Sequence, residues 1–156
     1  MEDVAQYDSD LKVWLLVGDL HHKMFWLRQK ELAPLGITAS QLRILRLIEN
    51  LGAKATISAI AKEVNRKIDV LSRQTMTLEK DGLIKRTKGR PKSKLLTISL
   101  TKKSVELLKV AKHSDGMREV LSILTKEERQ QLDLILNRLS TKLNAYTFNK
   151  IDDWSA

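Results

Sequence analysis

The chain has 156 residues, enough for one domain with a hydrophobic core but too few for two large lobes. It has no cysteine, which excludes a disulfide framework, a zinc knuckle and a thiol redox centre. The acidic N-terminal stretch is unlike a signal peptide, and no apolar run has the roughly 20 residues that span a bilayer, so we expect a cytoplasmic protein with no membrane partner.

The positive charge is confined to one part of the chain. Residues 62–103, here called the basic segment, hold 13 lysines and arginines against 4 aspartates and glutamates, a net charge of +9. The whole chain also has a formal charge of +9, so the remaining residues are neutral overall. A basic cluster alone is usually only a solvated face, but a segregated excess is typical of a surface that binds a polyanion.

A long apolar helix is predicted first, over residues 11–32. Its apolar residues occur on nearly every face, so the helix requires cover on more than one side. A second copy of the chain is the cover we expect, and we therefore assign residues 10–33 to dimerisation.

A helix-turn-helix pattern follows a break at Pro34. Thr38 and Gln41 form a capping box that opens one helix ending near residue 52, and Thr56 can cap a short helix to residue 64. Asn65 suits a left-handed turn, and the next helix is predicted over residues 69–80. Leu71, Thr75 and Leu78 share one face of that helix, and the opposite face is polar.

Two short strands with a basic tip come next. Gly82 closes the preceding helix, and alternating residues predict strands over 83–86 and 94–100. Another helical run begins at Thr101, with a kink expected at residues 113–116. A second capping box, Thr125 with Glu128, opens a regular final helix to residue 146. We assign residues 101–148 to dimerisation.

This order is that of a winged helix-turn-helix, mainly α with a small two-stranded β wing. The major groove of DNA admits one helix, and side chains on its outer face read the bases. Arg73 can pair with guanine and Gln74 with adenine, while basic residues of the hairpin contact phosphates. The residues expected to contact double-stranded DNA are Lys67, Val70, Ser72, Arg73, Gln74, Thr77, Lys88, Arg90, Lys92 and Lys94.

Four stretches of the sequence together resemble a known family. They are "LAPLGITASQLRILRLI", "ISAIAKEV", "SRQTMTLEKDGLIKR" and "ISLT". In their order and spacing they resemble the MarR family of regulators. The resemblance implies an obligate homodimer with intertwined first and last helices, palindromic operators and often a small-molecule pocket. Arg73 lies where the family carries its recognition-helix arginine. Lys92 and Lys94 replace the family's Asp-x-Arg, and Ser104 replaces a glycine.

We therefore expect one domain over residues 1–156, with DNA-binding residues 38–100 and a wing at 83–100. The expected function is that of an effector-responsive repressor. Trp14, His21, Phe25 and Trp26 form a candidate pocket for a small aromatic or phenolic effector. The alternative for these side chains is the core of the dimer.

Other functions have less support. Three histidines without cysteine or regular carboxylate spacing make a poor metal site. The sequence has no Gly-rich phosphate loop and no nucleophile elbow, so we expect neither a cofactor nor an enzyme. The stronger alternative is an architectural protein that binds DNA with little regard to its sequence.

Overall fold

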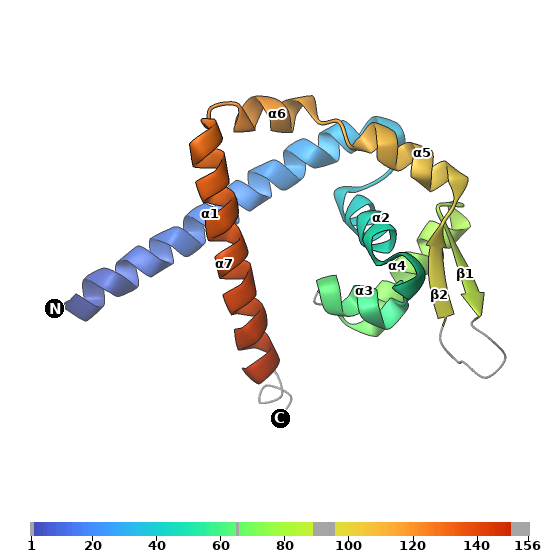
Figure 1. Cartoon of the computed structure of the whole chain (residues 1–156), viewed down its shortest axis with the longest axis horizontal. Helices are drawn as coiled ribbons and strands as arrows, with labels where there is room; N and C mark the ends of the chain where they lie inside the picture. Colours follow the sequence, from blue (N-terminus) through green and yellow to red (C-terminus); the bar gives the residue numbers. More distant parts are fainter. Residues whose placement is uncertain (1, 65, 89–95, 151–156) are drawn as a thin grey trace. The chain divides into compact units, whose positions relative to one another are not determined.

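The computed structural model describes residues 2–64, 66–88 and 96–150 (Figure 1). The chain forms two compact units, Met1–Met117 and Arg118–Ala156. The elements are α1 (Glu2–Leu32), η1 (Ala33–Leu35), α2 (Ala39–Leu51), η2 (Gly52–Lys54), α3 (Ile57–Val64), α4 (Ile68–Lys80), β1 (Ile84–Lys88), β2 (Leu96–Leu100), α5 (Lys102–Ala111), α6 (Asp115–Leu121) and α7 (Lys126–Lys150). The predicted fold class, mainly helical with a two-stranded wing, is confirmed.

The first helix is longer than predicted. The expectation was a start at Leu11, whereas α1 begins at Glu2. The intervening sequence contains no glycine or proline that would stop a helix. It is mostly polar, so it lacks the apolar periodicity from which a helix is predicted. No helix in the described ranges is both long and apolar enough to cross a membrane.

The predicted capping interactions are present at the starts of α2 and α3. The backbone N–H of Gln41 donates to Thr38 Oγ1 at 3.1 Å, and that of Thr38 donates to Gln41 Oε1 at 2.8 Å, which completes the capping box of α2. Thr56 Oγ1 accepts from the N–H of Ala59 at 3.1 Å and caps α3. Both helices therefore begin at the predicted places. Asn65 lies outside the described residues.

Within the first unit, buried side chains from α1 through α5 and from both strands form a hydrophobic core. Its large buried side chains are Leu32, Leu45, Ile48, Ile60, Leu71, Leu78, Ile84, Ile98 and Leu108. Thr75 is also buried, and its hydroxyl donates to the carbonyl of Ser72 at 2.9 Å. The predicted inner face of α4 is therefore confirmed, and this packing fixes which face of α4 points outward.

The wing is an antiparallel pair whose register runs from Ile84 opposite Leu100 to Lys88 opposite Leu96. The first strand was expected over residues 83–86, but β1 begins one residue later and continues to Lys88 because pairing with β2 extends it. The N–H of Ile98 donates to the carbonyl of Ala55 at 2.9 Å, so the base of the wing is also held to the segment before α3.

The helical run after the wing is broken, not merely kinked. α5 ends at Ala111 and α6 begins at Asp115. Arg28 from α1 donates to the carbonyls of Ala111 and His113, the latter at 3.3 Å, and so satisfies carbonyl groups at the end of α5. This interaction joins residues more than 80 positions apart, and no local pattern predicts it.

Glu31 contacts the residues on the C-terminal side of the same break. Its carboxylate accepts from the Ser114 hydroxyl at 2.5 Å and from the N–H of Gly116 at 2.8 Å. The hydroxyl of Ser114, with further contributions from Arg28 and the Gly116 amide, lowers the pKa of Glu31. A Cβ at Gly116 would approach Glu31 Oε1 and Leu27 Cδ1 to 3.0 Å, so this position requires a glycine or a local shift.

Two further caps complete the helices. Thr101 and Ser104 form a capping box at the start of α5, and Ser104 is completely buried. The sequence comparison with the family treated Ser104 only as a replaced glycine. In the second unit, the N–H of Thr125 donates to Glu128 at 2.8 Å and the N–H of Glu128 to Thr125 at 3.2 Å, as predicted.

Candidate nucleic-acid interface

The outward face of α4 carries an exposed arginine. The side chain of Arg73 is 75% exposed, and its Nη2 lies 3.3 Å from Oδ2 of Asp69, one turn earlier. Thr77 is exposed on the next turn and its hydroxyl donates to the carbonyl of Arg73 at 3.3 Å. Within the described residues the guanidinium donates only to Asp69, so most of its donors are available to a ligand.

The other residues predicted to contact DNA in and beside α4 differ in how exposed they are. Lys67 is exposed and occupies the N-cap position of α4. Val70 and Ser72 are half-buried, at the margin between the outward face and the core. The structure therefore brings Lys67, Arg73 and Thr77 to the accessible surface and places Val70 and Ser72 beside it.

Gln74 lies differently from Arg73, although the two are neighbours in sequence. Its side chain is half-buried, and its Oε1 is buried without a hydrogen-bond partner in the part of the chain that the structure describes. A buried, unpaired carbonyl oxygen typically costs about 1–3 kcal/mol, so such a group signals a missing donor. In this conformation Gln74 does not extend outward beside Arg73.

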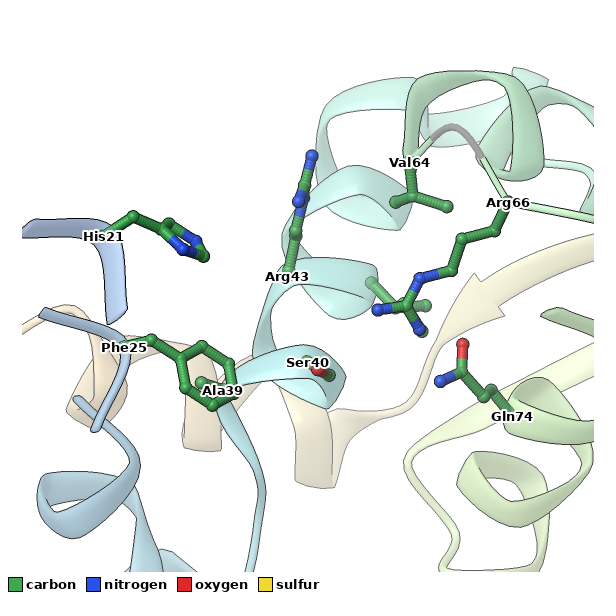
Figure 2. A pocket seen from close by; sticks show the side chains of 9 residues that line it. His21, Phe25, Ala39, Ser40, Arg43, Val64, Arg66 and Gln74 are labelled. Carbon is green, nitrogen blue, oxygen red and sulfur yellow. The ribbon is translucent and has the colours of Figure 1, made fainter. Parts of the chain in front are cut away.

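The unpaired oxygen of Gln74 faces a cavity of about 170 Å³. The cavity is lined by His21, Phe25, Ala39, Ser40, Arg43, Ile44, Val64, Arg66 and Gln74. Figure 2 shows the side chains of Arg66 and Gln74 pointing toward each other, with His21 and Phe25 entering from α1. The cavity therefore combines apolar walls with two guanidinium groups and one free acceptor.

Only part of the predicted effector pocket lines this cavity. His21 and Phe25 do, with ring centroids 6.3 Å apart. Trp14 and Trp26 do not line it, and they are 69% and 51% exposed. Sequence reasoning missed Arg43, although it follows Ala39 and Ser40 at helical spacing and so shares their face of α2.

A carboxylate ties the wing to α4. Glu79 accepts from the backbone N–H of Arg86 at 3.1 Å and from its Nε at 2.6 Å, while Nη2 lies 2.5 Å away. The Arg86 side chain, followed by its backbone N–H, lowers the pKa of Glu79. Because Glu79 is on α4 and Arg86 on β1, this ion pair holds the first strand of the wing against α4.

The tip of the wing is only partly described. Lys88 is the last residue of β1, and the predicted contacts Arg90, Lys92 and Lys94 lie outside the described residues. The described ranges contain no group of three or more histidine, aspartate or glutamate side chains that could hold a metal ion.

The two long helices expose apolar side chains along their length. On α1 these are Leu11, Val13, Trp14, Leu15, Leu16, Val17, Leu20 and Trp26. On α7 they are Leu132, Leu134, Ile135, Leu136, Leu139, Leu143 and Tyr146. Such large exposed patches are typical of surfaces that bind another chain.

Comparison with known proteins agrees with this geometry. Residues 37–90 match the MarR family. No curated protein matches the chain in sequence. Among solved structures, the chain is similar to a Staphylococcus aureus MepR–DNA complex, with 23% identity, a TM-score of 0.72, and 83% of this chain and 96% of that chain covered.

Two other structures share the fold. A mutant Escherichia coli MarR complexed with operator DNA has 20% identity and a TM-score of 0.75, covering 85% of this chain and 96% of that one. The organohalide-sensing regulator RdhR bound to 2,4-dichlorophenol has 23% identity and a TM-score of 0.77, covering 88% and 83%. The predicted winged-helix fold and the resemblance to the family are thereby confirmed.

Proposed function

We propose that this chain, which matches the MarR family over residues 37–90, is a transcription regulator and not an enzyme, and that it is an effector-responsive repressor that binds a palindromic operator as a homodimer. The observation that carries the proposal is the exposed Arg73 on the outward face of α4, within the segment that holds the net positive charge. Such a protein would repress by covering a promoter, and its location would be the cytoplasm, where it shares a compartment with that DNA.

In the proposed complex α4 enters the major groove. Arg73 has the planar donor fork that matches guanine O6 and N7. Ser72, Thr77 and Lys67 contact phosphates, and Val70 packs against the edge of the groove. Gln74 reads adenine only after its amide leaves the cavity, because its oxygen is buried in the conformation described here.

The wing supplies affinity that does not depend on sequence. Lys88, Arg90, Lys92 and Lys94 are proposed to contact phosphates, since lysine is a point charge and lacks the planar fork needed to read a base. Neutralising one of these residues should weaken binding to all sequences alike and reduce the salt slope by about 1. An unchanged slope would mean that the wing does not reach the DNA.

The exposed apolar faces of α1 and α7 support the homodimer. We assign dimerisation to residues 10–33 and 101–148, and we treat residues 1–156 as one domain that is complete only as a pair. Two copies related by a two-fold axis would place their recognition helices about 34 Å apart, which predicts a palindrome of about 16–20 base pairs.

The cavity beside Gln74 is the proposed effector site. Phe25, Ile44 and Val64 suit an aromatic body, and Arg43 and Arg66 suit an anionic or phenolic group. A ligand that donates a hydrogen bond to Gln74 Oε1 would hold this side chain away from DNA. RdhR, which shares the fold, was solved with 2,4-dichlorophenol, a small phenol of the class we propose here.

The decisive test is selection of binding sites from genomic or random DNA, followed by the Arg73→Ala variant. We expect one shared palindrome, and we expect Arg73→Ala to cost about 1–3 kcal/mol on it while relaxing one base preference. Lys30→Ala removes a positive charge outside the basic segment and serves as the control. Enriched sites without a common palindrome would support the architectural alternative, and equal losses on operator and random DNA would remove the base-reading role of Arg73.

A further inference from the structure

An acidic side chain shares the exposed face of α4 with Arg73. The basic segment contains only four acidic residues, and Glu79 is engaged by Arg86. Asp69 is different, because its side chain is 67% exposed on the same face as Arg73. A carboxylate on a surface that meets phosphates opposes binding to any DNA, whatever its sequence.

Asp69 contacts the arginine that is proposed to read a base. Its Oδ2 lies 3.3 Å from Nη2 of Arg73, at i and i+4 spacing on α4. The contact engages one of the two terminal nitrogens, so the rest of the guanidinium keeps donors for a base edge. The pair therefore restricts where the fork points without using up its hydrogen-bonding capacity.

The carboxylate of Asp69 is expected to contribute little to the stability of the fold. An exposed ion pair between neighbouring helical turns contributes little to folding, and an acidic residue in the first turn adds only a modest helix-dipole term. A substitution at Asp69 should consequently leave the fold intact. Its effect on DNA binding can then be measured separately from its effect on stability.

We propose that Asp69 is a specificity-determining residue that lowers affinity for random DNA and orients Arg73 toward base edges. The proposal rests on α4 being the DNA-reading helix, as argued above. Without the carboxylate, Arg73 is free to neutralise a phosphate on any sequence, which raises random binding more than operator binding. Specificity is a difference between two affinities, and a repulsive element against the unwanted partner increases that difference.

The test compares the full-length protein with Asp69→Asn on the selected operator and on random duplex DNA over a range of salt concentrations. We expect Asp69→Asn to bind random DNA about three- to tenfold more tightly, with a salt slope steeper by about 1, because one more cation contacts phosphate. The ratio of operator to random affinity should fall by a similar factor. Asp69→Glu keeps the charge at i and i+4 spacing and should retain most of the ratio.

The matched control is Glu106→Gln. Glu106 pairs with Lys109 at 2.7 Å on α5 and is 70% exposed, so this variant also removes one carboxylate and one exposed helical ion pair. It changes the net charge equally but should leave the ratio unaltered. Melting temperatures of all variants check that the fold is retained.

Two results would overturn the proposal. One is Asp69→Asn behaving like Glu106→Gln, and the other is equal weakening on operator and random DNA. In an Arg73→Ala background, Asp69→Asn should change the ratio much less, because the arginine that it orients is gone. Failure of the proposed function would look different, since the wild-type protein would then select no shared palindrome at all.

Discussion

Leu45 and Leu71 in the winged-helix region are completely buried by other parts of their own unit, whereas Trp14 and Leu16 on α1 are 69% and 60% exposed. α7 also exposes a stripe of apolar side chains, as α1 does, whereas the large apolar side chains of the winged-helix region are mostly buried. One region completes its core within a single chain, and the other leaves apolar surface that a single chain does not cover. This difference supports the proposal that one part of the molecule reads DNA and that another part joins two copies of the chain.

Removing α7 should produce the largest effect. Deleting residues from Lys126 onward leaves every member of the hydrophobic core in place, yet we expect an unfolded or insoluble product because the proposed dimer interface is lost. Circular dichroism and sedimentation would check this. A soluble monomer that melts cooperatively would show that the winged helix is stable alone.

Leu45→Ala should have the next largest effect, a loss of about 2–5 kcal/mol in the free energy of unfolding. Leu45 has no exposed surface, so truncation leaves a cavity in the packed core. The control is Ile68→Ala, because Ile68 is 59% exposed and lies outside both segments assigned to dimerisation, so its truncation should stay within about 0.5 kcal/mol. Chemical denaturation of both variants at one protein concentration provides the comparison.

Leu16→Ala tests the opposite region. If the exposed stripe of α1 meets a second copy, this truncation should cost about 1.5–3 kcal/mol in each protomer and shift the dimer toward monomer on dilution. If Leu16 instead stays in contact with water, the loss in free energy of unfolding should be close to zero. Sedimentation equilibrium over a roughly hundredfold range of protein concentration distinguishes the two outcomes, because it measures whether the variant dissociates to monomer on dilution.

The smallest expected effect is a change with pH. The pKa values of Glu31 and Glu79 are lowered in the folded state, by Ser114 and by Arg86 respectively. Both carboxylates therefore add stability above the unfolded pKa of about 4.3, and this stability is lost as the pH falls through the folded values. Glu31→Gln and Glu79→Gln should each flatten the fall in unfolding free energy below about pH 5.

Equal pH dependence in the wild type and both variants would mean that neither carboxylate is paired in solution. Because Glu79 joins α4 to the wing, Glu79→Gln should also weaken DNA binding, whereas Glu31→Gln should not. The two variants thus separate a contact between α4 and the wing from one that holds the end of α5.

Local rules predicted much of this fold. The capping boxes at Thr38 and Thr125 begin their helices where the sequence indicates, and the inner face of α4 follows from helical spacing. Each of these features depends on residues within two turns of one another. The start of α1 was missed because its first turns lack an apolar pattern.

Features built by distant residues were not predictable in this way. The break after Ala111 depends on Arg28 and Glu31, and the cavity depends on side chains from four separate helices and the turn before α4. The orientation of Gln74 is the most instructive case. Its spacing allows it either to extend outward or to turn inward, and only the packing of α1 and α2 beside it creates the space into which it turns.

The ion pair between Glu79 and Arg86 has a consequence for attempts to retarget the protein. A recognition helix is often regarded as a replaceable part, to be exchanged between regulators by grafting its outward residues. Here a graft that replaced Glu79 would also release the first strand of the wing, because the carboxylate holds both the backbone and the side chain of Arg86. Because β1 is paired with β2 over its whole length, the smallest unit that can be transplanted with its geometry intact must include α4, β1 and β2.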